Sequence, residues 1–273
     1  MKQEKTCAKI NDTSVNARLH AIGCPMRLRV YESLSSTSTT LREEAEHGAR
    51  EGDVILARTQ TGGRGRLGRS FHSPSDTGLY FSILLRPTFG LENAGYLTTA
   101  TAVAVARVLE RACGKSVAIK WVNDLYVDGK KICGILTESA VDAEARTFRY
   151  AVVGVGINLL PPREGFPEEL KDVAGAAFEE MADDASKLLA DILASFWALY
   201  CRLPDRAFMQ EYRDRSNLIG QNVTVTVGEE SCVGLVKDID FEGSLILQAA
   251  DGTLRAFRSG TVRIAEENYE NLP

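Results

Sequence analysis

The stretch "TQTGGRGRLGRSFHSP", residues 59–74, carries four glycines and three arginines within positions 62–69. Its centre, Gly63 to Gly68, fits the pattern G-x-G-x-x-G, which occurs in dinucleotide-binding loops. Such a loop must be followed by a helix whose N-terminus holds the pyrophosphate. Here "DVILAR" (53–58) predicts a buried strand before the loop, and "TGLYFSILLRP" (77–87) predicts a strand directly after it. The pattern therefore predicts two strands joined by a basic loop and excludes a Rossmann fold.

Two other short motifs suggest phosphate-binding folds but lack their context. Residues 117–120 spell V-A-I-K, the kinase strand motif that carries the ATP-binding lysine, yet the chain has no H-R-D, D-F-G or A-P-E sequence. Gly114-Lys115-Ser116 matches the end of a P-loop, but Leu109 stands where the first glycine is required. We therefore exclude both folds.

The composition is that of a globular protein with one large and one small domain. The chain has 273 residues, 44% of them hydrophobic, and a net charge of −5, which does not favour nucleic acid or an anionic membrane. The six cysteines include no C-x-x-C pair, and only three histidines are present, so a zinc site is not expected. We expect reduced thiols, no signal peptide, no membrane span and a cytoplasmic location.

The rest of the chain predicts an α+β protein. Alanine-rich residues 92–112 and the amphipathic segment 185–203 predict helices, and a second helix is expected at 205–215. Asp128-Gly129 predicts a tight hairpin, and "RYAVVGVGINLL" (149–160) predicts a buried strand followed by a loop over 161–177. From Leu218 onward, short strands separated by glycine turns predict a small β-barrel.

The segment "KWVNDLYVDGKKICG" (120–134) adds a second polar cluster to the arginine-rich loop. Glycines let backbone N–H groups approach an anion, and arginines add forked donors, so the loop is suited to grip a phosphate or carboxylate. Lys130 and Lys131 must point to opposite faces of their strand, and Lys130 is expected at a solvated hairpin tip. An arginine–glycine patch for nucleic acid is the alternative, which the acidic net charge opposes.

Taken together, "GRGRLGR" (63–69), "KWVNDLYVDGKKICGIL" (120–136) and "GVGINL" (154–159) resemble, in order and spacing, the three signatures of biotin protein ligases. "SSTS" (35–38) resembles the biotin-contacting Ser-Thr segment of that family, and the β-rich C-terminus resembles its SH3-like domain. The resemblance covers roughly residues 30–265. It implies a mixed sheet flanked by helices, as in class II synthetase-like ligases, with a small SH3-like barrel.

The implied activity is that of an ATP-dependent biotin–[acetyl-CoA-carboxylase] ligase. Biotin attacks the α-phosphate of ATP to give biotinyl-5′-AMP, and a lysine of a biotin carboxyl carrier domain then takes the biotin. ATP, biotin and Mg²⁺ are the implied ligands, and the carrier domain of a biotin-dependent carboxylase is the implied partner. A lipoate or octanoate ligase is the related alternative, because that family shares the core fold. Exposed edge strands also allow a homodimer.

The resemblance also assigns roles to individual residues. Lys131 and Arg66 resemble the catalytic residues. The biotin-binding set is Ser36, Thr37, Ser38, Gln60, Gly63, Arg64, Gly65, Arg66, Lys131 and Gly134. The nucleotide-binding set is Arg66, Arg69, Phe71, Lys120, Trp121, Asn123 and Asn158. Among the residues themselves, Asp124 is the nearest candidate Mg²⁺ ligand, and it could equally order the arginine-rich loop.

The chain departs from the family pattern at a few positions. Phe71 stands where a tryptophan is usual and would stack less strongly on adenine, while Val122 replaces the usual proline. We expect a catalytic domain over residues 1–216, with 1–28 as an N-terminal extension, and a C-terminal domain over 217–273. Only about thirty residues precede "SSTS", which predicts a monofunctional ligase without a DNA-binding domain.

Overall fold

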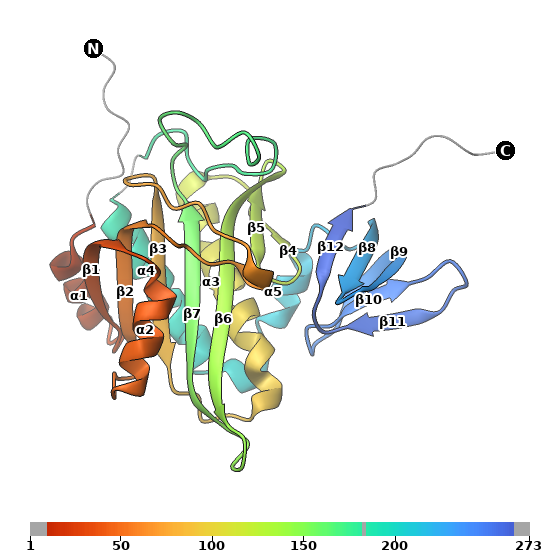
Figure 1. Ribbon diagram of the computed structural model, residues 1–273, viewed down its shortest axis with the longest axis horizontal. Helices are drawn as coiled ribbons and strands as arrows, with labels where there is room; N and C mark the ends of the chain where they lie inside the picture. The colour runs from red at the N-terminus through yellow and green to blue at the C-terminus, as the bar shows by residue number, and fades with distance from the viewer. Residues whose placement is uncertain (1–9, 182–183, 265–273) are drawn as a thin grey trace.

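The computed structural model describes residues 10–181 and 184–264. Its larger part is a seven-stranded mixed sheet with the strand order β1-β2-β3-β7-β6-β5-β4 (Figure 1). Only β1 and β2 are parallel, and every other neighbouring pair is antiparallel. The strands are β1 (Arg27–Leu34), β2 (Asp53–Gln60), β3 (Gly78–Leu85), β4 (Ala118–Lys120), β5 (Asp124–Val127), β6 (Lys130–Asp142) and β7 (Thr147–Asn158).

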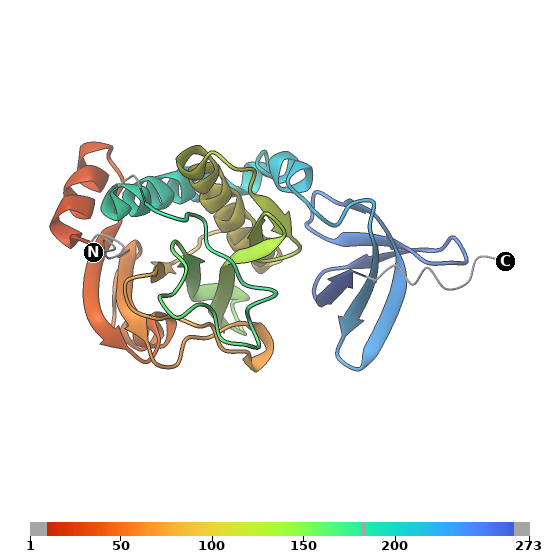
Figure 2. The same ribbon diagram turned by 90° about the horizontal axis from the view of Figure 1, so that it is seen from above.

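Helices cover the two faces of this sheet unequally. Figure 2 shows α1, α3 and α4 side by side on one face, where they close the main hydrophobic core. Leu41 and Ala45 of α2 pack against the other face, with Ile55, Leu84 and Val152, in a smaller cluster. The helices are α1 (Asp12–Ala21), α2 (Thr37–Glu46), α3 (Ala94–Cys113), α4 (Ala185–Tyr200) and α5 (Met209–Asp214), with short 3₁₀ turns η1 (Arg66–Gly68), η2 (Leu91–Asn93) and η3 (Leu203–Asp205).

The alternation of side chains along β3 and β7 decides where a cavity can form. Leu79, Phe81 and Ile83 of β3 point into the main core, and so do the alternate residues of β7 from Ala151 to Ile157. The residues between them face α2 and include Ser82, Gly154 and Gly156. Leu84 and Val152 fill the part of this face that lies under Leu41 and Ala45 of α2. Beside the N-terminus of α2, the sheet presents the small residues Ser82 and Gly154. The small residues leave room above the sheet.

The strand–loop–strand prediction for the opening stretch is confirmed. β2 pairs antiparallel with β3, and only the short turn η1 interrupts the arginine loop, which we define as residues 61–77. Leu67 and Gly68 at its tip both take positive φ angles, 56° and 73°. Asp128 and Gly129, with φ of 50° and 74°, form the predicted hairpin turn between β5 and β6.

Two predictions are modified. The second C-terminal helix begins at Met209 instead of residue 205, because Arg206 takes a left-handed backbone conformation with φ of 55°. The C-terminal strands form an antiparallel sheet in the order β11-β10-β9-β8-β12, so β11 and β12 lie at opposite edges and the described residues form no closed barrel. The strands are β8 (Asn222–Val227), β9 (Glu230–Ile239), β10 (Leu245–Gln248), β11 (Leu254–Phe257) and β12 (Thr261–Ile264).

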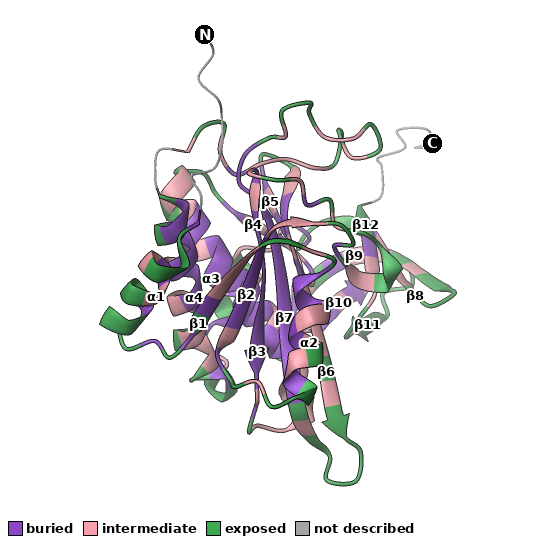
Figure 3. Cartoon of the chain, turned by 60° about the vertical axis from the view of Figure 1, so that its left-hand side comes forward, coloured by how far each residue is buried: buried purple, intermediate pink, exposed green. Residues whose placement is uncertain are grey.

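Figure 3 shows the burial of these elements, with the central strands buried and the far end of the β6–β7 hairpin exposed.

Within residues 10–181 and 184–264, no helix is both long and apolar enough to cross a membrane. The five cysteines in this part of the chain form no disulfide, and Cys7 lies outside the described residues. The ends of the two predicted domains, residues 1–9 and 265–273, also lie outside them.

Candidate active site

A cavity of about 600 Å³ lies over the small-residue half of the sheet, beneath the arginine loop. Its walls come from the N-terminus of α2, the segment 120–136, the loop after β7 and the edge of the second sheet. Six cationic side chains and one carboxylate line it, in a chain whose net charge is −5: Arg64, Arg66, Arg69, Lys120, Lys131, Arg263 and Asp124. The local charge therefore opposes the global charge and favours an anionic ligand.

One end of the cavity is a buried network of hydroxyl and amide groups. Ser36 caps α2, and Thr37 and Ser38 form its first turn, with all three residues buried. The Thr37 Oγ1 lies 2.7 Å from the Ser82 Oγ, and the Ser38 Oγ lies 2.9 Å from the same oxygen. Gln60 accepts from the Thr37 amide at 2.9 Å. The network suits a small neutral polar group, such as a urea, which offers both donors and an acceptor.

The floor of the cavity depends on glycine. A Cβ atom on Gly156 would lie 2.5 Å from the ring of Phe71, and one on Gly154 would lie 2.5 Å from the Ser38 Oγ. Gly134 on β6 also lies beneath Phe71, and its Cβ would come within 3.3 Å of the ring. Phe71 makes an edge contact with Tyr80, with ring centroids 6.3 Å apart. Phe71 thus lies on the glycine floor, and its stacking on adenine stays a prediction.

Gly63 and Gly65, the glycines of the arginine loop that were predicted to bind biotin, differ in position. Gly63 is buried and does not line the cavity; a Cβ there would lie 2.5 Å from the Phe71 carbonyl oxygen, so this close approach requires glycine. Gly65 lines the cavity, and its amide donates to the Arg69 carbonyl at 2.7 Å. Arg64, predicted to contact biotin, forms an ion pair with Glu138 at 2.9 Å, a carboxylate that Arg42 also binds. The sequence alone did not indicate this partner, because Glu138 lies 74 residues away.

A chain of polar contacts joins the predicted catalytic residues. Arg66 donates to the Asn123 Oδ1 at 2.9 Å, and the Asn123 amide donates to the Asp124 Oδ1, also at 2.9 Å. The same carboxylate oxygen lies 2.7 Å from the Lys131 Nζ. Burial lowers the pKa of Arg66, and the charge of Asp124 partly opposes that shift. Lys131 and Arg66, from distant segments, are therefore brought into one network through Asn123 and Asp124.

Lys120 lines the cavity among other cations, and the charge of Arg69 is one of those that act on it. The Lys120 Nζ lies 5.8 Å from the centroid of the Tyr126 ring, a cation–π distance. Burial lowers the pKa of Lys120, and the neighbouring charges of Lys131 and Arg263 contribute to the decrease. Burial also raises the pKa of Tyr126 to about 12. A buried cation with a lowered pKa favours the arrival of a compensating anion.

Three of the side chains considered in the sequence make contacts that no local motif indicated. Trp121 lines the cavity but is only 4% exposed. Its indole N–H donates to the Gly243 carbonyl at 2.9 Å, so its polar group is bonded to the C-terminal part of the chain. Asn158 does not line the cavity; its amide donates to the Gly175 carbonyl at 3.0 Å and holds the following loop. Lys130 is not simply solvated, because its ammonium group donates to the carbonyls of Lys171 and Asp172.

Sequence reasoning missed several residues that line the site. Leu170 and Val173 come from the loop after β7, and Thr261 to Arg263 come from the second sheet. No local motif marks them, since they reach the cavity only through the tertiary arrangement. The polar Ser82 within an apolar strand and the alternating glycines of "GVGIN" were the signals that could have revealed the hydroxyl network and the floor.

The described residues contain no group of three or more His, Cys, Asp or Glu side chains arranged to hold a metal ion. Asp124 is the single carboxylate among the residues that line the cavity. Mg²⁺ needs only one or two protein carboxylates when substrate phosphates supply other ligands. Asp124 therefore fits an Mg²⁺ ion that arrives with a nucleotide and does not fit a permanently bound metal.

Comparisons with known proteins match both parts of the chain. A family described as "Biotin/lipoate A/B protein ligase family" matches residues 30–158, and "Biotin protein ligase C terminal domain" matches residues 218–264. The bifunctional ligase/repressor BirA of Bacillus subtilis is 32% identical over 258 residues, which are 93% of this chain and 79% of the relative. A biotin–[acetyl-CoA-carboxylase] ligase of Mycobacterium tuberculosis is 31% identical over 255 residues, covering 90% of this chain and 92% of that protein.

The fold comparison agrees with the sequence comparison. The biotin protein ligase from Aquifex aeolicus, solved in complex with biotin and ATP, superposes with a TM-score of 0.74. The match covers 87% of this chain and 99% of that chain, at 27% sequence identity.

Proposed function

Since the chain belongs to the biotin/lipoate A/B protein ligase family, we propose that it is an ATP-dependent biotin protein ligase. The observation that carries this proposal is the division of one cavity into two chemically different ends. A neutral hydroxyl–amide network and a glycine floor suit the ureido ring of biotin, whereas the cationic end suits a triphosphate. At the cationic end, Lys131 forms an ion pair with Asp124. Asn123 links Asp124 to Arg66 by hydrogen bonds.

In the first step, a biotin carboxylate oxygen attacks the α-phosphorus of ATP, the bond to the bridging oxygen breaks, and pyrophosphate leaves. Both reactants are anions, so the site must hold them together against their repulsion. We propose that Lys131 contacts the attacking carboxylate and the α-phosphate, while Arg66 and Lys120 stabilise the charge of the nucleotide. Asp124 holds Lys131 in place and is the candidate contact for an Mg²⁺ ion bound to the phosphates, which would neutralise part of their charge.

In the second step, the amine of an acceptor lysine attacks the mixed anhydride, and AMP leaves. The adenylate must be shielded from water until the acceptor arrives. We propose that the arginine loop provides this shield, because its tip bears an exposed Leu67 and Arg66 links it to the wall of the cavity. The expected acceptor is the carrier domain of a biotin-dependent carboxylase. We further propose residues 1–216 as the catalytic domain and 217–273 as the C-terminal domain.

Incubation of the protein with ATP, Mg²⁺, biotin and a carrier domain from the same cell tests this function. The expected result is a mass increase of one biotinyl group on a single carrier lysine, with release of pyrophosphate. Absence of transfer to that carrier would refute the proposal. The related lipoate ligase activity is separated by competition: excess lipoate should leave biotin transfer unchanged.

A further inference from the structure

The turn formed by residues 120–124 brings Lys120, Asn123 and Asp124 to the cavity and lies at the end of the sheet that has the shortest strands. It connects β4, which has three residues, to β5, which has four. β4 is the last strand of the sheet, and its free side pairs with the linker to the second sheet: the Ile119 amide donates to the Arg215 carbonyl at 2.8 Å, and the Asn217 amide donates to the Ile119 carbonyl at 3.1 Å. Short edge strands have few hydrogen bonds of their own, so the geometry of this turn depends on what lies behind it.

Tyr212 of α5 supplies a direct contact from behind the turn. The residue has no exposed surface, and its hydroxyl donates to the Val122 carbonyl at 3.0 Å. Burial raises the pKa of Tyr212, so the phenol keeps its proton and remains a donor. The charges of Arg66 and Asp124 also act on this phenol: Arg66 lowers its pKa and Asp124 raises it.

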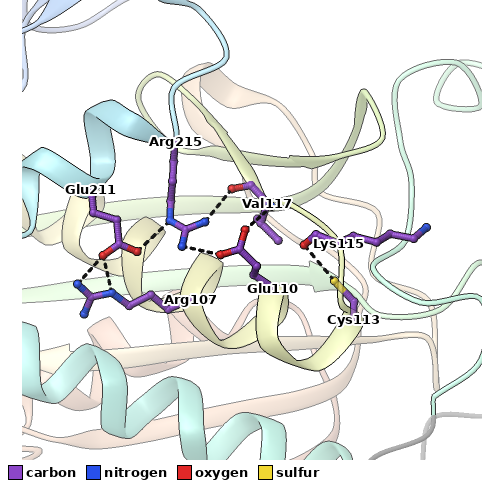
Figure 4. A network of polar contacts seen from close by, with 7 residues as sticks. All are labelled: Arg107, Glu110, Cys113, Lys115, Val117, Glu211 and Arg215. Carbon is purple, nitrogen blue, oxygen red and sulfur yellow. Dashed lines mark hydrogen bonds and ion pairs between the residues drawn. The ribbon is translucent and has the colours of Figure 1, made fainter.

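Helix α5 is a firm support for this contact. Figure 4 shows how Arg107 and Glu110 of α3 meet Glu211 and Arg215, two residues that come shortly before and after Tyr212 in the sequence. The Arg107–Glu211 pair measures 2.6 Å, the Arg215–Glu110 pair 2.8 Å and the Arg215–Glu211 pair 2.9 Å. Arg215 also donates to the Val117 carbonyl at 3.3 Å, just before β4. The ion pairs thus fix α5 relative to the strand that leads into the turn.

We propose that Tyr212 is a positioning residue of the active site, acting through the Val122 carbonyl to hold Asn123 and Asp124 in register with Arg66 and Lys131. Val122 directly precedes Asn123, which bonds both Arg66 and Asp124. Loss of the hydroxyl would leave the Val122 carbonyl without its donor and let the turn move away from the nucleotide. The biotin end, held by the N-terminus of α2 and the glycine floor, has no contact with Tyr212 and should be unaffected.

This inference rests on the proposed function only for the identity of the nucleotide. Its test is therefore a binding measurement that needs no turnover: calorimetric titration with α,β-methylene-ATP, in which the bond broken by adenylation is not cleavable. Tyr212→Phe removes one hydroxyl and keeps the ring. We expect the dissociation constant for the analogue to rise about three- to tenfold, the range that one net hydrogen bond allows. The dissociation constant for biotin should stay within about twofold of wild type, since its end of the cavity keeps all its contacts.

Tyr96→Phe is the matched control. Tyr96 is also buried, at 3% exposure, and its hydroxyl donates to the backbone carbonyl of Phe241 at 3.0 Å, but it does not line the cavity. Both variants should lower the thermal stability of the protein by similar amounts, and only Tyr212→Phe should weaken the binding of the nucleotide analogue. Equal effects of the two variants on analogue binding, an equal loss of biotin affinity in Tyr212→Phe, or failure of Tyr212→Phe to fold would each overturn the positioning role. A wild-type protein that binds the analogue but ligates no biotin would instead count against the proposed function.

Discussion

Substitution of Lys131 by methionine should slow adenylate formation strongly while leaving the fold intact. The methionine keeps most of the apolar stem and removes the ammonium group, which lies 2.7 Å from the Asp124 carboxylate. The Lys131 side chain is 33% exposed, so its removal leaves no cavity in the core. The variant therefore tests the contribution of the ammonium charge separately from that of the packing of the side chain.

The magnitude follows from the surroundings of this charge. A cation about 4 Å from a phosphate oxygen contributes about 4 kcal/mol at an effective dielectric constant of about 20. Partial exposure reduces this to about 2–3 kcal/mol, which corresponds to a decrease of roughly 30- to 150-fold in rate.

Pyrophosphate release under single-turnover conditions measures the step directly. Lys130→Met is the matched control, because Lys130 is the adjacent residue and its ammonium group binds loop carbonyls outside the cavity. We expect this control to stay within about threefold of wild type, as for a surface contact. Retention of the wild-type rate by Lys131→Met, or an equal loss in both variants, would refute the assigned role.

Three further predictions concern the floor, the loop and the cationic wall. Gly156→Ala should weaken biotin binding by about 1–3 kcal/mol, because its Cβ would lie 2.5 Å from the Phe71 ring; an unchanged dissociation constant in calorimetry would contradict this packing. Arg66→Gly should loosen the arginine loop and release the adenylate, so that mass spectrometry finds biotin on lysines other than the carrier lysine; unaltered selectivity would argue against the shield. Burial lowers the pKa of Lys120, and a bound triphosphate should raise it again, so ATP affinity should fall as pH increases through the lowered pKa. Lys120→Arg, which stays charged, should flatten that dependence, and an equally steep pH profile in the variant would show that another group titrates.

The elements that follow from local chemistry were predictable from the sequence. Apolar runs flanking the arginine loop predicted β2 and β3, and Asp128-Gly129 predicted the hairpin, because only neighbouring residues decide such features. The alternation of strand residues placed Lys130 and Lys131 on opposite faces, and the structure brings only Lys131 into the cavity. The order and spacing of the motifs also indicated the family.

The tertiary structure alone decided how these motifs are completed. Ser82 forms a hydrogen bond with Thr37, Glu138 forms an ion pair with Arg64, and the Asn158 amide donates to a carbonyl of the loop after β7. These contacts exist because strand register and helix packing bring distant segments together. Contacts such as that of Tyr212 with Val122 span 90 residues and leave no periodic signal in the chain. A sequence specifies which groups can carry a reaction, whereas the register of distant strands decides which of those groups face the same cavity.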